Sequence, residues 1–562
     1  MFSLPLFSSF LIQKIKYCDH FDIMVKIGGV NVSMKKLLMV LLLPCLFLTS
    51  ITFPHYYSSI AFETSSLDKI VDYSRNSTTC VNGEWSKTFD SGATDGAGCV
   101  QQTSDGGFII AGCHSINRGL NSVSWVIRTN SFGRMIWSRE YNYSGSHPYP
   151  YIITTYFSYV EETSDGGFIL VGSCYLDVES IWLVRIDGLG NKVWSKVIRD
   201  PLNDTTGVCV HQLADGCFIV AAYNMGAALL IKVDGDGSVI WKKVYPASCC
   251  TTFIKHMEVT SDGGFVLVGE KPGFGVWVIR TDSEGNMLWE SCIPETSWMD
   301  HAEWIEETSD GGFIISGGVG DPFGNNDVWL IRMDGQGNIL WNKTFGGGLP
   351  EIGYCVRETS DGGFVIAGFT ASFSLSEGSD FWIIKTDQYG NKEWGRILDG
   401  DARSDDIASC ICETSDGGFV VVGITCTGVK DNLFDIWLVK IMPDNKPPSK
   451  PVVTGPSTAK INKPYTVNFS SVDPEGDDIY YFVIAWYVGV SGWIGPYKSG
   501  ETVSFTVFNH APQGVYNITV KAIDSHGWDS LMSDPLRVTF PKPYWLNLLP
   551  SFIQRILLLY QT

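Results

Sequence analysis

Hydrophobic and polar positions follow one another in short runs along most of the chain, and one of these runs recurs. In ETSDGGFIISGG, residues 307–318, an S-D-G-G turn is followed by an apolar strand signal, and related copies lie before and after it. The copies are marked by seven turn aspartates: Asp105, Asp165, Asp215, Asp262, Asp310, Asp361 and Asp416. Their spacing of 47 to 60 residues is typical of repeat folds such as solenoids and propellers.

Each repeat contains four strand signals. In the sixth repeat they are YCVRETS, FVIAGF, WIIKTD and KEWGRIL, with an SDGG turn after the first and a QYGN turn after the third. Both turns supply glycine or asparagine where a hairpin requires a positive φ. Four antiparallel strands in a repeat of about fifty residues are typical of a propeller blade.

The seventh repeat lacks a fourth strand, because WLVKI from Trp437 runs into a proline-rich linker at residues 443–451. A matching strand lies near the N-terminus, where GEWSKTFDSG at residues 83–92 resembles WNKTFGGG at residues 341–348. Complementary ends favour a closed ring over a linear solenoid, which requires capping repeats. The sequence therefore predicts an all-β protein, with a seven-bladed β-propeller over residues 82–442 that is closed by an N-terminal strand.

The repeat motif resembles the TSDGGF-type propeller repeats of secreted bacterial and archaeal proteins, and the resemblance extends over residues 82–442. It implies the fold and a microbial origin but no particular ligand, since one fold hosts many functions. Residues 452–541 carry alternating strand signals that predict an immunoglobulin-like β-sandwich. The stretches VDPEGDDIYY and YNITVKAIDSHG resemble PKD or fibronectin type III modules, which implies a spacer or adhesion role.

Both ends of the chain are apolar. Residues 34–61 combine a charged start with an apolar run and small residues before Phe62, which predicts a signal peptide or a retained anchor. Residues 1–33 are interpreted as a leader upstream of the true start at Met34. The short tail at residues 542–562 is expected to dock on the protein or to lie in a membrane interface. The expected location is extracellular, at the cell surface.

Six N-x-S/T triplets agree with export as glycosylation sites: Asn76, Asn142, Asn203, Asn342, Asn468 and Asn517. The formal net charge of −20 excludes a nucleic-acid partner, because phosphate binding requires a cationic face. Of the fifteen cysteines, Cys99, Cys209, Cys355 and Cys410 each lie six residues before a turn aspartate. This periodic position favours small buried core residues over disulfides.

Charged residues also follow the repeat, with one lysine or arginine in every third strand. We expect each to pair with an acidic neighbour, because a feature present in every repeat is architectural. We also expect the turn aspartates to bind their own backbone. A calcium site is considered at Asp473, Glu475, Asp477 and Asp478, for which a plain acidic turn is the alternative. No cofactor is required.

The repeats differ in two loops, one between the second and third strands and one between the fourth strand and the next repeat. In a meander both loops fall on one face, here called the loop face, and both hairpin turns fall on the opposite turn face. Ligand-binding residues are predicted in the two loop-face stretches 142–160 and 295–304, and they are His147, Tyr149, Tyr151, Tyr156, Trp298, Asp300 and His301. Tyrosine suits glycan or protein recognition, because it offers a large contact area at low entropic cost.

The motifs H-E-x-x-H, G-x-S-x-G and the P-loop are not present, so no catalytic residue is assigned. The predicted function is that of a non-catalytic binding or adhesion protein of a microbial cell surface, with a glycan or a surface protein as partner. The alternatives are a secreted polysaccharide hydrolase or lyase and a structural cell-envelope repeat protein. A hydrolase is expected to have close carboxylates in a concave pocket of the loop face, whereas a binding protein is expected to have an aromatic platform there.

Overall fold

The computed structural model divides into two units, Met1–Asp68 and Lys69–Thr562, and each is considered by itself. The structure describes the following residues: 24–27, 30–33, 83–116, 121–143, 154–175, 178–200, 204–247, 253–271, 274–294, 300–320, 325–376, 378–400, 405–426, 433–460, 463–485, 489–507 and 514–541. In the first unit a single hairpin is described, formed by β1 (Met24–Ile27) and β2 (Val30–Ser33). Every regular element within these ranges is a strand.

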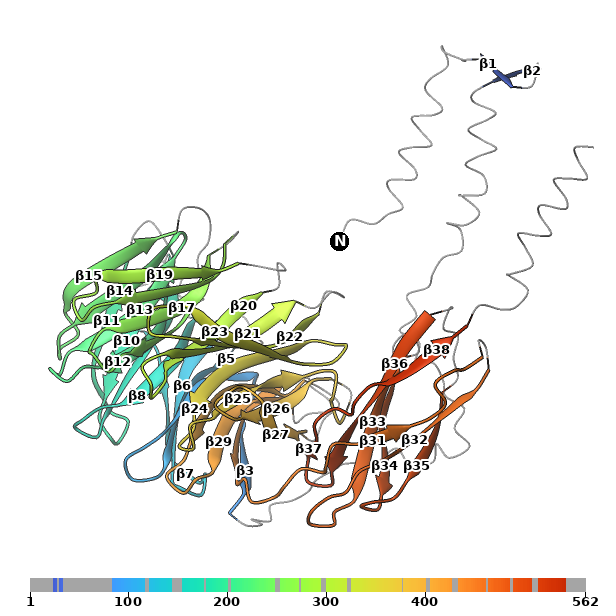
Figure 1. Cartoon of the computed structure of the whole chain (residues 1–562). Coiled ribbons are helices and arrows are strands. Elements are labelled where there is room, and N and C mark those ends of the chain that lie inside the picture. The colour runs from blue at the N-terminus through green and yellow to red at the C-terminus, as the bar shows by residue number, and fades with distance from the viewer. Residues whose placement is uncertain are drawn as a thin grey trace, which may run out of the picture. The chain divides into compact units, whose positions relative to one another are not determined.

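The second unit contains seven successive groups of four antiparallel strands, which we number as sheets 1 to 7 (Figure 1). Sheet 1 consists of β4 Asp95–Gln102, β5 Phe108–Ile116, β6 Asn121–Thr129 and β7 Met135–Tyr141. Sheet 2 consists of β8 Thr155–Glu162, β9 Phe168–Tyr175, β10 Glu179–Ile186 and β11 Lys192–Ile198. Sheet 3 consists of β12 Thr205–Gln212, β13 Phe218–Asn224, β14 Ala227–Val233 and β15 Val239–Pro246. Sheet 4 consists of β16 Phe253–Val259, β17 Phe265–Lys271, β18 Gly275–Thr281 and β19 Met287–Ile293. Sheet 5 consists of β20 His301–Glu307, β21 Phe313–Gly320, β22 Asn326–Met333 and β23 Ile339–Phe345.

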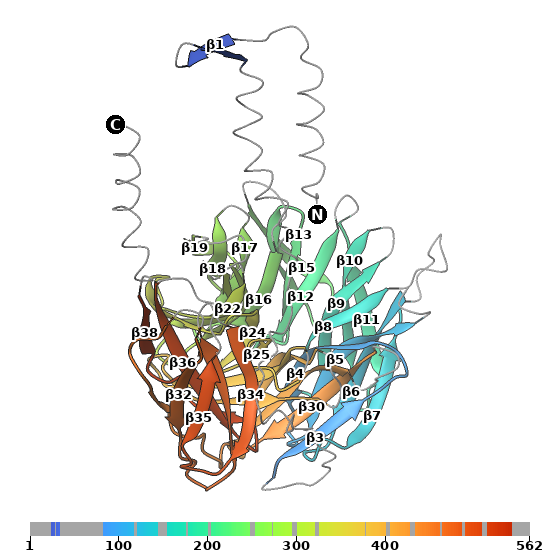
Figure 2. The same cartoon turned by 90° about the vertical axis from the view of Figure 1, so that its right-hand side faces the viewer.

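Sheet 6 consists of β24 Glu351–Glu358, β25 Phe364–Thr370, β26 Asp380–Thr386 and β27 Lys392–Leu398. Sheet 7 combines β28 Ile407–Glu413, β29 Phe419–Cys426 and β30 Phe434–Ile441 with β3 Trp85–Phe89 from the start of the unit. Strand β3 runs antiparallel to β30, with Trp85 opposite Lys440 and Phe89 opposite Ile436, and Figure 2 shows blue β3 beside orange β30. The predicted completion of the seventh repeat by the N-terminal strand is therefore confirmed.

The SDGG turns form as the sequence predicts. In sheet 1 the Thr103 N–H donates to the Gly107 carbonyl, and Gly106 has a φ of 81°, which favours glycine. The Asp105 carboxylate accepts the N–H of Gly107 at 3.0 Å, so the turn aspartate does bind its own backbone. The turn thus places the second strand beside the first, and the continuous apolar run at residues 108–111 buries both faces of β5 there.

The first strand of each sheet contacts the first strand of the next, from β4 through β28, and β28 in turn contacts β4. The turns join the same neighbours, because the serine of one SDGG turn donates its N–H to a Glu or Gln at the end of the next first strand. The six pairs are Ser104–Glu162, Ser164–Gln212, Ser261–Glu307, Ser309–Glu358, Ser360–Glu413 and Ser415–Gln102. The last pair links sheet 7 to sheet 1, so the order of contacts is cyclic.

The C-terminal module contains two sheets. One consists of β31 Val452–Thr454, β32 Tyr465–Ser470 and β35 Val503–Val507, and the other of β33 Ile479–Ala485, β34 Gly489–Tyr497, β36 Gly514–Asp524, β37 Trp528–Asp529 and β38 Leu536–Phe540. A core that includes Phe469, Tyr481 and Val520 fills the space between them. Strand β37 also pairs with β27, so the second sheet is continuous with sheet 6 (Figure 1).

Ten cysteines lie in the described part of the chain, and all ten are free thiols, as the sequence predicts. Within the same described residues, no helix is long and apolar enough to cross a membrane.

Candidate binding face and carboxylate clusters

The cation in each third strand pairs with the turn aspartate of its own sheet. The seven pairs are Arg128–Asp105, Arg185–Asp165, Lys232–Asp215, Arg280–Asp262, Arg332–Asp310, Lys385–Asp361 and Lys440–Asp416. Hydrogen bonding by Arg280 lowers the pKa of Asp262 to about 2, so this carboxylate is ionised at neutral pH. Each repeated cation therefore pairs with an acidic neighbour, as predicted. These pairs stabilise the turns, so the cations do not form a ring of unpaired charge that could bind a ligand.

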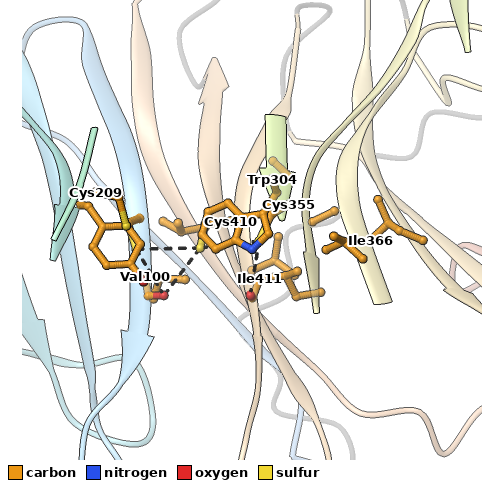
Figure 3. Packing of buried hydrophobic residues seen from close by; sticks show 14 of the residues in the cluster. Val100, Cys209, Trp304, Cys355, Ile366, Cys410 and Ile411 are labelled. Atoms are coloured by element: carbon orange, nitrogen blue, oxygen red, sulfur yellow. Dashed lines mark hydrogen bonds between the residues drawn. The ribbon is translucent and has the colours of Figure 1, made fainter. Parts of the chain in front are cut away.

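The first strands also carry a buried layer of unlike side chains, six residues before each turn aspartate (Figure 3). The thiol Sγ atoms of Cys99 and Cys355 each lie 4.0 Å from the Sγ of Cys410. On the other side of the layer, Trp304 from sheet 5 stacks on His256 at 3.6 Å between ring centroids and contacts Tyr159 from sheet 2 at 6.4 Å. Contacts between sheets this far apart in the sequence show that packed side chains fill the space between the first strands at this level.

Two of the predicted loop residues lie in strands instead. Tyr156 belongs to β8, where its hydroxyl donates to the Glu179 carboxylate at 2.7 Å, and burial raises the pKa of this tyrosine above its usual range. His301 begins β20, with its Nε2 atom 3.7 Å from Glu303. The prediction that these two residues belong to irregular loops is wrong. Strands β8 and β20 begin earlier in the sequence than the apolar and polar pattern indicates, so both residues lie within strands. Asp300 is buried and accepts the Gly320 N–H at 2.8 Å.

The remaining predicted binding residues, His147, Tyr149, Tyr151 and Trp298, lie outside the described residues. Among the glycosylation candidates, Asn142, Asn342 and Asn517 are exposed, and Asn468 is half-buried and accepts the Ser504 hydroxyl. Asn76 and Asn203 are not among the described residues.

The loop face of sheets 2 to 4 exposes large apolar side chains that the sequence analysis did not single out. Tyr175 ends β9, Phe253 begins β16 and Phe274 lies between β17 and β18, and they are 43%, 36% and 47% exposed. Phe253 packs edge-on against Tyr223 of sheet 3, with 5.5 Å between ring centroids. We call Tyr175, Tyr223, Phe253 and Phe274 the aromatic group. Its sequence signal is an aromatic residue near the loop end of a strand, at positions that are aromatic in only some of the repeats.

Three of the four acidic residues considered for calcium in the module, Asp473, Asp477 and Asp478, have different partners. Asp473 is buried and accepts the N–H groups of Glu475 and Asp477, both at 3.0 Å, as in an Asx turn. Asp478 pairs with Lys498 at 2.7 Å, and Asp477 lies 3.1 Å from the His526 ring. Calcium binding by these four residues stays a prediction.

Buried carboxylates occupy one position at four junctions between sheets, at the loop-face start of the first strand: Asp300, Glu351, Asp406 and Asp95. Glu351, Asp406 and Asp95 each accept the backbone N–H of the second residue after a fourth strand, from Gly347, Gly400 and Ser91 respectively. At the junctions of sheets 6 with 7 and 7 with 1, two further aspartates complete a cluster, namely Asp380 with Asp399 and Asp435 with Asp90.

Glu351 is fully buried, and burial raises its pKa to about 7, although three hydrogen bonds from Gly347, Thr370 and Ser372 oppose the shift. Because the folded state takes up this proton at a higher pH than the unfolded state, the free energy of unfolding should rise as the pH falls from about 7 to about 4.5. The variant Glu351→Gln should lose this rise, which amounts to at most about 3 kcal/mol at 1.36 kcal/mol per pKa unit. Urea unfolding at several pH values measures it.

The exposed variant Glu284→Gln serves as the control and should keep the pH dependence of the parent protein. An unchanged pH dependence in Glu351→Gln would show that this carboxyl group is not the one that titrates.

No protein-family model matches this chain, and no curated protein is significantly similar to it. Among solved structures, the chain is similar to the PKD domain of an M14-like peptidase from a Thermoplasmatales archaeon, with 39% identity over 17% of this chain and 99% of that chain and a TM-score of 0.17. It is also similar to a bifunctional GH43-CE protein of Bacteroides eggerthii, with 10% identity, 65% and 54% of the two chains covered and a TM-score of 0.27.

A third similar structure is the acylaminoacyl peptidase of Pyrococcus horikoshii, with 10% identity, 78% of this chain and 57% of that chain covered and a TM-score of 0.25. This chain thus spans little more than half the length of either of these two proteins.

Proposed function

We propose that the chain is an exported, non-catalytic binding or adhesion protein of a microbial cell surface. In this proposal its seven sheets are the blades of a seven-bladed β-propeller, and its loop face binds a glycan or a protein. The cyclic contacts between first strands and the completion of sheet 7 by β3 support the propeller. The observation that carries the function is the exposed aromatic group on the loop face of sheets 2 to 4.

Aromatic side chains suit this role because they bury a large area on contact and lose little conformational entropy. The aromatic group is a property of particular repeats, whereas the charged side chains common to all repeats are engaged in the turns. The Phe274 ring lies 5.6 Å from the ammonium group of Lys271, a buried residue that pairs with Glu290. A glycan with apolar sugar faces and flanking hydroxyl groups fits such a surface.

The carboxylate clusters argue against the hydrolase alternative. Catalytic carboxylates of glycoside hydrolases must contact the scissile bond. Among the described residues, the clustered Asp380, Asp406 and Asp95 are at most 2% exposed, which keeps these three from a polymeric substrate and leaves Asp90 as the exposed member of its cluster. The C-terminal module, which continues sheet 6 through β37, would hold the loop face at a fixed orientation to its attachment point.

A glycan array probed with the purified protein tests the proposal. We expect binding to a restricted set of glycans, with no release of reducing ends from the polysaccharides that contain them. Turnover of a bound polysaccharide would contradict the non-catalytic function. Absence of binding both to glycans and to cell-surface proteins of the producing organism would favour a purely structural envelope protein.

A further inference from the structure

Three aspartates meet where sheet 6 joins sheet 7 on the loop face. Asp380 begins β26, Asp399 directly follows β27, and Asp406 directly precedes β28. Each offers a carboxylate oxygen that lies within 4.8 Å of the other two. Asp380 and Asp406 are 0% and 1% exposed, so two of the three carboxylates are removed from water.

One carboxylate oxygen at this junction accepts no hydrogen bond from the described residues. The Leu375 N–H donates to Oδ2 of Asp380, and the Gly400 N–H donates to Oδ2 of Asp406. Oδ1 of Asp380 is buried and has no hydrogen-bond partner within the described part of the chain. An unsatisfied buried oxygen of a charged group is costly, and natural structures seldom keep one without a ligand or a bound ion.

The same three positions recur at the next junction, where Asp435, Asp90 and Asp95 also lie within 4.8 Å of one another. Asp380 and Asp435 each stand two residues before the tryptophan of a third strand, and Asp399 and Asp90 each directly follow a fourth strand. At the junction of sheets 5 and 6, Asp327 and Glu351 are present, but Gly346 takes the third position. The full cluster is thus a feature of particular junctions.

We propose that Asp380, Asp399 and Asp406 bind a calcium ion that joins sheet 6 to sheet 7. Calcium binds oxygen ligands at about 2.3–2.6 Å, so two ligands of one ion are at most about 5 Å apart. The three carboxylates meet this limit, and backbone carbonyl groups or water would complete the 6–8 ligands that calcium takes. The site is independent of the ligand proposed for the loop face.

Three carboxylates lie close together at this junction, and burial adds to their mutual repulsion. Burial raises the pKa of Asp380, and the negative charges of Asp399 and Asp406 raise it further. Burial likewise raises the pKa of Asp406 to about 7. A divalent cation would reverse both effects, because the ionised carboxylates would then face an opposite charge.

The test measures calcium bound per chain by the purified, EDTA-treated protein, using isothermal titration calorimetry and terbium luminescence as a second readout. Asp399→Asn, at a half-buried position, should lower the number of bound ions by one and reduce the calcium-induced rise in Tm. Asp380→Asn should do the same. The matched control Asp327→Asn, at the junction with Gly346, should leave the number unchanged.

Equal calcium binding by the parent protein, Asp399→Asn and Asp380→Asn would overturn the proposal, as would a parent protein that binds no calcium. An equal response to magnesium at the same concentration would overturn the choice of calcium, because magnesium demands a compact octahedral shell. Loss of glycan binding with calcium binding intact would leave this site standing, so the two proposals fail separately.

Discussion

Replacing Asp529 with alanine is expected to lower the free energy of unfolding by about 3–5 kcal/mol, the usual cost of removing one partner of a buried ion pair. Asp529 is fully buried in β37, where its Oδ2 atom accepts from Lys392 of β27 at 2.6 Å and from Lys521 of β36. Burial alone would raise the pKa of Asp529, but the attraction of the two lysines outweighs it and holds this pKa below its usual value. Without the carboxylate, two buried ammonium groups would face each other.

Urea unfolding followed by tryptophan fluorescence measures the effect, with limited proteolysis of the linker at residues 443–451 as a test of docking. Asp534→Ala is the matched control in the same module, because Asp534 pairs with Lys450 at an exposed position and such pairs contribute about 0–1 kcal/mol. Equal stability of Asp529→Ala and Asp534→Ala would show that the ion pairs of Asp529 with Lys392 and Lys521 do not hold the module against sheet 6.

Removal of strand β3 is expected to cause the second large loss of stability. A chain that begins at Ala93 lacks Trp85 and Phe89, both buried, and leaves β30 as an open edge. Burial of two such side chains contributes about 1.5–3 kcal/mol each, and loss of the strand pairing adds to this, so the total is comparable with the 5–15 kcal/mol that stabilises a typical domain. We expect the truncated chain to unfold at a much lower temperature or to aggregate through the open edge.

A chain that begins at Gly83 is the control, since it keeps β3 together with Glu84, whose carboxylate pairs with Arg396 at 3.2 Å and accepts the Met442 N–H. A synthetic peptide of residues 83–92 should partly restore the Tm of the truncated chain. Cooperative unfolding of that chain at the Tm of the control would mean that β3 is dispensable for the fold.

The repeated part of the fold could be predicted from the sequence because each of its determinants is local. The SDGG turn, the apolar strand after it and the third-strand cation lie within one repeat, so Arg280 and Asp262 find each other without help from distant residues. The pairing of β3 with β30 could also be predicted, since GEWSKTF carries the pattern of the fourth strands. Because β3 carries this pattern itself, it pairs with β30 although several hundred residues separate the two strands in the sequence.

The docking of the module could not be predicted in this way. Strand β37 has two residues, and its Asp529 is charged, so periodicity assigns it to the surface. Only the tertiary structure, which places Lys392 and Lys521 against it, accounts for its burial. The same holds for Tyr156, because the bulge between Phe157 and Tyr159 in β8 shifts the alternation on which a sequence assignment depends.

The cluster of Asp380, Asp399 and Asp406 was missed for a different reason. Its members come from two repeats and from three different strand ends, and none of them looks unusual alone. A usable signal does exist in the sequence, namely an aspartate two residues before the third-strand tryptophan in some repeats, as at Asp380 and Asp435.

In the proposed function, the repeated positions build the fold and the loop face binds the ligand. A direct test compares two triple variants for binding to the glycan selected on the array. Tyr175→Ala with Phe253→Ser and Phe274→Ser alters the loop face, and Phe132→Ser with Leu189→Ser and Tyr389→Ser alters turn-face positions that are more exposed. We expect at least a tenfold loss of affinity, about 1.4 kcal/mol, in the first variant and a change below twofold in the second. Loss of binding in the turn-face variant, with the loop-face variant unaffected, would contradict the proposal that the loop face binds the ligand.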